Sequence, residues 1–251
     1  MVEHRSPKPR VAGSNPVSPA KIIMAVTFSK KPSVEAITDI CAELLHLLQS
    51  DKKVLWLVSG GSCIPIQVEI MECLRATAAE KLHSLIIMPV DERYGPTGHA
   101  DSNTAQMELA GFDPYDAQWY DVLGGLPLQE TVVAYRQLSE DLFATVDAVA
   151  ATLGMGPDGH TAGILPGSPA VTDMSASVVG YTWTDYIRLT LGMPLLLGIH
   201  KTYLLSYGNS KAAALKRFRS NKEPFEKLPV KLLYDLPDVT VYNDYITTSG
   251  E

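Results

Sequence analysis

The chain has 251 residues, 46% of them apolar and 20% charged, a balance that allows one large domain with a core of ordinary size. It contains no run of about eighteen apolar residues, so we expect no membrane span. The formal net charge of −7 argues against nucleic acid as the main partner, because a phosphate backbone requires a basic field. A few Lys and Arg side chains can still hold one small phosphate.

The first residues of the chain are polar, rich in Pro and Ser, and lack the apolar segment of a secretory signal. We expect residues 1–20 to form a disordered tail and residues 21–251 to form a single α/β domain. The three cysteines, Cys41, Cys63 and Cys73, match no zinc-binding pattern. Their odd number favours a reduced compartment over a disulfide framework, and we therefore expect a cytoplasmic protein.

Helical and strand-like segments alternate along the chain. Apolar residues recur at helical spacing over residues 34–48, and the uniformly apolar run at residues 54–58 indicates a buried strand. Further helices are expected at about residues 65–78, 128–143 and 210–218, and further strands at residues 85–90, 147–153, 187–191, 202–206 and 239–242. This alternation predicts crossover connections, and hence a mostly parallel twisted sheet with helices on both faces, of the Rossmann-like type.

Three polar segments directly follow expected strands: the turn at Gly60 and Gly61, the triplet at residues 91–93, and the loop that begins at Gly154. Ligands bind beyond the carboxyl ends of the strands in sheets of this kind. We therefore expect the three segments to converge at one edge of the sheet.

Two of these segments allow more than one interpretation. The turn Ser59-Gly60-Gly61-Ser62 lies before a helix, where free N–H groups can cradle a phosphate, or it is an ordinary turn. In the triplet, Arg93 can fork to a phosphate, and Asp91 or Glu92 can transfer protons. An isolated triplet of this kind can equally be a surface cluster of ion pairs.

The third segment, residues 154–167, contains five glycines and two prolines. Ordering so many glycines costs backbone entropy, which indicates that the shape of this loop serves a purpose. Asp158 stands two residues before His160. A neutral imidazole can remove a proton from water near pH 7, and a nearby carboxylate can orient it. A lone histidine can also be a surface or core residue, but its place in a glycine-rich loop after a strand favours function. His99 can line the same cleft or pack at its rim.

Two basic residues later in the chain are candidates for anion binding. Arg188 alternates with Ile187 and Leu189, so it faces the opposite side of its strand. Lys211 falls in the first turn of an expected helix, where the helix dipole disfavours a cation unless an anion compensates. Either residue taken alone can also be an ordinary solvated cation.

Taken together, these segments resemble the 6-phosphogluconolactonase family, whose relatives include the glucosamine-6-phosphate deaminases. The resemblance spans roughly residues 54–243. It is carried, in chain order, by Ser59-Gly60-Gly61-Ser62, by Asp91-Glu92-Arg93 with Pro96 and Asp101-Ser102-Asn103, by residues 154–162 with Pro166-Gly167, by Arg188-Leu189-Thr190, and by Gly208 with Lys211.

The resemblance implies a catalytic domain that hydrolyses 6-phospho-D-glucono-1,5-lactone to 6-phosphogluconate, the second step of the oxidative pentose phosphate pathway. It implies that His160 is the general base on the attacking water, that Asp158 positions or polarises the site, and that Asp91 is a further catalytic residue. The implied phosphate-binding residues are Ser59, Gly60, Gly61, Ser62, Arg93, Arg188 and Lys211. The implied partner is a small sugar phosphate lactone, with no metal, organic cofactor, nucleic acid or membrane, and the protein is expected to be a monomer or homodimer.

The sequence departs from the family pattern in three places. Cys63 and Ile64 both stand before Pro65, one residue more than in the family's loop. Gly163 and Leu165 replace a serine and a phenylalanine, and residues 183–186 lack the family's proline.

Two alternatives remain open. A glucosamine-6-phosphate deaminase requires a glutamate where residues 164–167 offer no carboxylate, and Arg93 stands where deaminases carry an aromatic residue. A non-catalytic sugar-phosphate-binding protein would not need the general-base candidate, which is intact here.

Overall fold

The computed structural model describes residues 26–49 and 52–248, and the tail expected at residues 1–20 lies outside these ranges. The strands are β1 Thr27–Lys30, β2 Val54–Val58, β3 Leu85–Pro89, β4 Asp91–Arg93, β5 Gln118–Trp119, β6 Ala148–Gly154, β7 Val178–Thr182, β8 Ile187–Leu191, β9 Lys201–Ser206 and β10 Val239–Asn243. The helices are α1 Ser33–Leu48, α2 Ile64–Ala78, α3 Asn103–Leu109, α4 Leu128–Thr145, α5 Pro169–Thr172, α6 Met193–Leu196 and α7 Ala212–Ser220.

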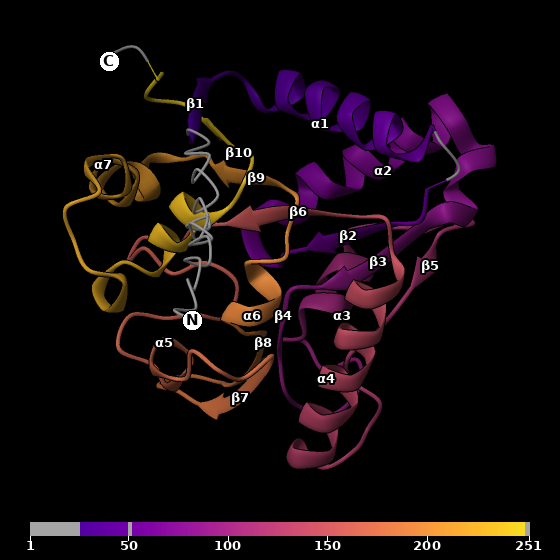
Figure 1. Ribbon diagram of the computed structural model, residues 1–251. Coiled ribbons are helices and arrows are strands. Elements are labelled where there is room, and N and C mark those ends of the chain that lie inside the picture. The colour runs from indigo at the N-terminus through magenta and orange to yellow at the C-terminus, as the bar shows by residue number, and fades with distance from the viewer. Residues whose placement is uncertain (1–25, 50–51, 249–251) are drawn as a thin grey trace, which may run out of the picture.

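A seven-stranded sheet in the order β1-β10-β9-β6-β2-β3-β5 runs through the molecule, and every neighbouring pair in it is parallel (Figure 1). The expected mostly parallel α/β sheet is thus confirmed. From β2 the chain proceeds through α2 to β3 on one side, whereas β6 and β9 lie on the other side of β2. The direction in which strands are added to the sheet therefore reverses beside β2. In open α/β sheets, ligands bind at the point where the strand order reverses.

Strand β2 is buried along its whole length, and alternate residues face the two helical layers. Trp56 packs in the core cluster that contains apolar residues of α1 and α2. Leu55 and Leu57 pack in the other cluster, with residues of α4 and α7. Both faces of the sheet are therefore covered, which explains why this strand is apolar at every position.

Helices α1 and α2 lie side by side on one face and are joined by a disulfide between Cys41 and Cys73 (Figure 1). The odd number of cysteines favoured reduced thiols over a disulfide framework, and the pairing of Cys41 with Cys73 corrects that expectation. The packing of the two helices brings the Cα atoms to 6.3 Å, a separation that a disulfide spans. The odd residue, Cys63, is free and buried.

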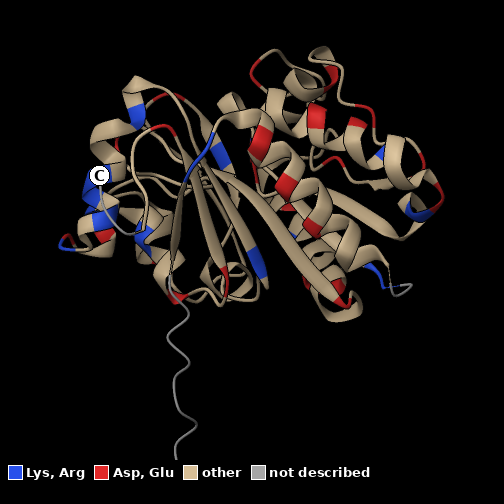
Figure 2. Ribbon diagram, turned by 90° about the horizontal axis from the view of Figure 1, so that it is seen from above, with Lys and Arg blue, Asp and Glu red and all other residues tan. Residues whose placement is uncertain are grey.

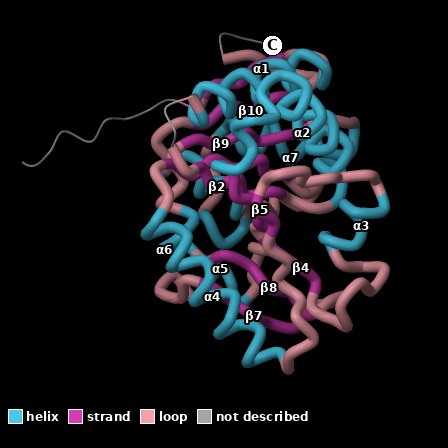
Figure 3. The backbone as a smooth tube through the Cα atoms, turned by 90° about the vertical axis from the view of Figure 1, so that its right-hand side faces the viewer, coloured by secondary structure: helices cyan, strands magenta, loops and turns pink. Residues whose placement is uncertain are grey.

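A second, three-stranded antiparallel sheet in the order β4-β8-β7 lies apart from the large sheet (Figure 3). The strand expected at residues 187–191 is present as β8, but it belongs to this small sheet. The expected strand at residues 85–90 ends as β3 at Pro89, and the triplet at residues 91–93 is itself strand β4. After Val90 the chain therefore passes from one sheet into the other.

Acidic and basic residues are unevenly distributed among the helices (Figure 2). Helix α1 carries Glu35, Asp39 and Glu43, whereas α7 is basic. Within the described ranges, no helix combines the length and the apolar character needed to cross a bilayer.

Candidate active site

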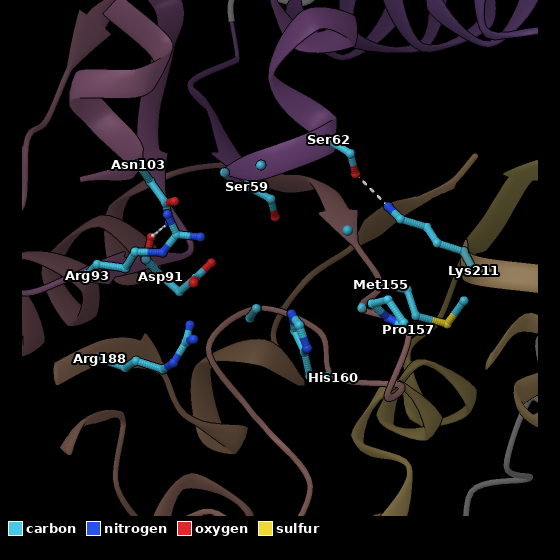
Figure 4. Close-up of a pocket in the computed structure, with 15 residues that line it drawn as sticks. Ser59, Ser62, Asp91, Arg93, Asn103, Met155, Pro157, His160, Arg188 and Lys211 are labelled. Atoms are coloured by element: carbon cyan, nitrogen blue, oxygen red, sulfur yellow. Dashed lines mark hydrogen bonds between the residues drawn. The ribbon is translucent and has the colours of Figure 1, made fainter. Parts of the chain in front are cut away.

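A cavity of about 200 Å³ lies at the carboxyl ends of β2, β3, β6 and β9, where the small sheet meets the large one (Figure 4). The three polar segments expected to converge do so here. The cavity is lined by Ser59, Gly60, Gly61, Ser62, Asp91, Arg93, Asn103, Gly154, Met155, Gly156, Pro157, His160, Ala162, Arg188 and Lys211.

The Gly60–Gly61 turn requires glycine at both positions. A Cβ on Gly60 would stand 1.9 Å from Asn103 Oδ1, and Gly61 has a φ of +64°. The extra residue after Ser62 is taken up by a 3₁₀ turn, η1 Gly61–Cys63, which continues directly into α2 with Pro65 in its first turn. The departure from the family pattern thus leaves the entry into α2 helical and unbroken.

The buried side chain of Gln67 holds the turn from behind. Its Oε1 accepts a hydrogen bond from the Ser59 N–H (2.9 Å), and its Nε2 donates to the Ser59 carbonyl (2.7 Å). Thr152 on β6 donates to the same Oε1 at 2.6 Å. The turn after β2 is therefore tied to the neighbouring strand by side chains with no exposed surface.

The alternation of β4 separates the two acids of the triplet. Asp91 and Arg93 line the cavity, whereas Glu92 is fully buried on the other side. Glu92 accepts hydrogen bonds from the N–H groups of Asn103 (2.6 Å) and Thr104 (3.0 Å) at the start of α3, so its role is to cap that helix. Burial raises the pKa of Asp91 to about 6, and the neighbouring Glu92 carboxylate adds to the rise.

His160 and Asp158 form a pair in the loop after β6. The His160 Nδ1 lies 2.7 Å from Asp158 Oδ1, which also accepts from the His160 backbone N–H at 3.1 Å. Partial burial raises the pKa of Asp158, but the hydrogen bonds from His160 outweigh burial and lower it. The carboxylate is therefore ionised near neutral pH and accepts only, so in the neutral form of the imidazole the proton lies on Nδ1 and the lone pair on Nε2.

The loop geometry around this pair also depends on glycine. A Cβ on Gly156 would stand 2.2 Å from the His160 ring and 2.6 Å from Asp158 Oδ1. A Cβ on Gly163 would meet Thr190 at 2.8 Å and Asp91 at 3.2 Å, and the Gly163 N–H donates to Thr190 Oγ1. Glycine in place of the family's serine therefore lets this loop approach the small sheet.

Cationic side chains reach the cavity from two sides of His160 (Figure 4). On one side, Lys211 Nζ donates to Ser62 Oγ at 2.5 Å, and burial lowers the pKa of Lys211. On the other side, the guanidinium groups of Arg93 and Arg188 lie 4.8 Å and 5.3 Å from the ring centre of Tyr186.

Four buried polar atoms of the lining residues have no hydrogen-bond partner: Ser59 Oγ, Arg93 Nε, Asn103 Oδ1 and Arg188 Nε. Buried polar groups without partners are rare in folded proteins, so these four atoms mark the wall of the cavity as unusually polar. Among the residues that the structure describes, no three His, Cys, Asp or Glu side chains are grouped to hold a metal ion.

Sequence reasoning assigned no role to Asn103, Met155 or Gln67. Asn103 stands in the Asp101-Ser102-Asn103 motif, and Gln67 is a polar residue on an otherwise apolar helix face, so both carried a signal. Asp158 supports His160 from outside the lining set, and His99 contacts the Arg93 carbonyl at 2.8 Å without lining the cavity.

The sequence matches the family model described as glucosamine-6-phosphate isomerases/6-phosphogluconolactonase over residues 29–241, most of the chain. The chain belongs to this family. A rice protein (Oryza sativa subsp. indica) named probable 6-phosphogluconolactonase 3, chloroplastic, is 31% identical over 202 residues, which cover 70% of this chain. The match spans only 59% of the rice protein's length. The 6-phosphogluconolactonase of Bos taurus is 27% identical over 187 residues, or 70% of this chain and 72% of the bovine protein.

Solved structures of the family share the fold. A 6-phosphogluconolactonase from Shewanella baltica superposes with a TM-score of 0.72 at 19% identity, covering 88% of this chain and 99% of that one. A monomeric glucosamine-6-phosphate deaminase superposes with a TM-score of 0.71 at 22% identity, covering 88% and 97%. These two structures are therefore about equally similar to this chain in backbone, so the fold alone does not distinguish between the two reactions.

Proposed function

We propose that this protein hydrolyses 6-phospho-D-glucono-1,5-lactone to 6-phosphogluconate, with His160 as the general base. The observation that carries the proposal is the presence of a carboxylate-supported imidazole and three cationic side chains around one cavity. The imidazole supplies the group that activates water, and the cations on its two sides supply the positive charge that attracts a phosphorylated substrate.

In the proposed reaction, His160 Nε2 removes a proton from a water molecule as the water oxygen attacks the lactone carbonyl. Asp158 stabilises the imidazolium that forms, because its ionised carboxylate accepts from Nδ1–H. The tetrahedral intermediate then collapses, the bond between the carbonyl carbon and the ring oxygen breaks, and the imidazolium returns the proton to that oxygen. Asp91, whose pKa of about 6 lets it hold or release a proton near neutrality, is proposed as a second catalytic carboxyl.

The phosphate is proposed to bind on the side of the Gly60–Gly61 turn, Ser62 and Lys211, and the two arginines add positive charge from the other side of His160. Lys211 then exchanges its Ser62 contact for a charge-assisted bond. Fixing the phosphate places the carbonyl against the water in attack geometry.

The name of the rice relative puts that protein in the chloroplast, whereas for this chain a cytoplasmic location stays a prediction.

The test is hydrolysis of freshly prepared 6-phosphogluconolactone, corrected for its spontaneous opening. His160→Ala is expected to lower kcat by at least about 100-fold, the smaller end of the range for a lost general base. Equal rates for the wild type and His160→Ala would exclude the catalytic role of His160.

The shared fold keeps deamination of glucosamine 6-phosphate as the second candidate. The segment after Gly163 places Ile164 and Leu165 in the core, so it provides no carboxylate for ring opening. Release of ammonia from glucosamine 6-phosphate at a rate above that for the lactone would favour the deaminase instead.

A further inference from the structure

The C-terminal part of the chain holds the loop that carries His160 at two points. The Val230 N–H donates to the Gly159 carbonyl at 3.0 Å, and the Gly167 N–H donates to the Glu226 carbonyl at 3.0 Å. Leu228, with no exposed surface, packs so closely on Gly159 that a Cβ there would stand 2.2 Å from its Cδ1. The middle and the end of the loop are thus fixed by one later segment of the chain.

Arg217, on the basic helix α7, joins this segment to Asp158, the acid of the catalytic pair. Its Nη1 donates to the backbone carbonyl of Asp158 at 3.1 Å. Its Nε and Nη2 each donate to the Glu223 carboxylate at 2.7 Å, and Nη2 also donates to the Lys227 carbonyl at 3.2 Å. One planar guanidinium therefore connects the backbone at Asp158, the carboxylate of Glu223 and the backbone at Lys227.

These contacts matter for the loop more than for the fold. The side chains of Arg217 and Glu223 are 36% and 32% exposed, and an ion pair of this exposure adds little to global stability. Asp158, by contrast, lies in a tight turn in which the Gly159 N–H donates to the Gly156 carbonyl at 3.0 Å, and Gly159 has a φ of +91°. The carbonyl that Arg217 holds belongs to the peptide unit that leads into Gly159, and a glycine backbone has little stiffness of its own, so this contact fixes the turn on its more flexible side.

We propose that Arg217, oriented by Glu223, is a positioning residue that holds Asp158 in register with His160 and thereby fixes the ring with its proton on Nδ1. The proposal rests on the proposed function for its kinetic consequence, but its structural consequence can be measured without turnover. When Arg217 is lost, the Asp158 carboxylate no longer has a fixed position, and the imidazole is free to exchange between its two neutral forms. A displacement of the base by about 1 Å is enough to cost up to about 100-fold in rate.

The experiment compares Arg217→Met with Arg219→Met, which removes the same charge from the same helix. Protein labelled with ¹⁵N at histidine is examined by NMR, because protonated and unprotonated ring nitrogens have distinct shifts, and His160→Ala identifies the signal. The wild type and Arg219→Met are expected to show the Nδ1–H form, and Arg217→Met a mixture of both forms. In the lactonase assay, kcat of Arg217→Met is expected to fall about 10- to 100-fold with KM changed less than twofold.

Two further variants keep the test decisive if Arg217→Met folds poorly, as judged by its thermal midpoint. Glu223→Gln and Arg217→Lys each leave part of the network and are expected to fall between the wild type and Arg217→Met in both measurements. A ring signal unchanged in all three variants overturns the positioning role. If instead His160→Ala hydrolyses the lactone like the wild type, the proposed function fails while the ring signal still decides the role of Arg217.

Discussion

Replacement of Gly156 by alanine adds one methyl group at the point where the catalytic pair is most crowded. The new Cβ would stand 2.2 Å from His160 Cε1 and Nδ1, where ordinary contact begins at 3.4 Å. The ring must therefore move by about 1.2 Å, and the Asp158 carboxylate, 2.6 Å from the same Cβ, must move with it. Gly156 is not among the residues with positive φ, so the backbone itself tolerates alanine.

A shift of the base by about 1 Å predicts a loss of kcat of about 100-fold, which corresponds to about 2.7 kcal/mol in the activation free energy. The free energy of unfolding should change by less than about 1 kcal/mol, because the methyl group displaces a partly exposed side chain rather than the core. The assay is lactone hydrolysis with urea unfolding on the same preparations. Gly124→Ala is the matched control, since its Cβ meets no atom within 4 Å.

The double variant Gly156→Ala/His160→Ala separates a local effect from a general one. If the methyl group acts through His160, the double variant is no slower than His160→Ala alone, because the displaced ring is already absent. Wild-type kcat in Gly156→Ala, or additive losses in the double variant, would refute this reasoning.

Three further outcomes are expected. The raised pKa of Asp91 means that the folded protein favours the neutral carboxyl. Asp91→Asn should therefore match the wild type in unfolding free energy near pH 4 and exceed it by about 3 kcal/mol above pH 7, as measured by urea unfolding. A difference in unfolding free energy that does not change with pH would contradict this. Lys211→Met should raise KM for the lactone about 10-fold or more with little change in kcat, whereas an unchanged KM would remove Lys211 from the phosphate site. In protein prepared without reductant and then denatured, one free thiol is expected, that of Cys63, and three free thiols would disprove the pairing of Cys41 with Cys73. Cys73→Ser should lower the unfolding free energy by about 2–4 kcal/mol, because the disulfide closes a loop between residues separated by 32 positions.

Local sequence was sufficient for the features that depend on local preference. The apolar run at residues 54–58, the glycine turn behind it and the glycine-rich loop after residue 153 each appear where they were expected. Each of these signals lies in adjacent residues, because strand burial and glycine backbone freedom act over a few positions. The parallel sheet followed from their alternation, whereas the short strands β1, β5 and β7 were missed.

The small antiparallel sheet could not be predicted from the same signals. Strand β4 has three residues, too few to show a period, and its partner β8 lies almost a hundred residues later. That pairing decides that Asp91 and Arg93 face the cavity while Glu92 caps α3. The two acids are neighbours in sequence with opposite roles, and only the register of the sheet separates them.

By itself, the sequence determined the family, the parallel sheet and the candidate residues at its carboxyl edge. Only the tertiary structure decided which of them share one cavity, that Asp158 supports His160 from behind, and that Gln67 and Arg217 hold the two loops in place. The physical reason is distance along the chain. Gln67 meets Thr152 across 85 residues and Arg217 meets Asp158 across 59, and contacts of that span arise from packing rather than from local backbone preference.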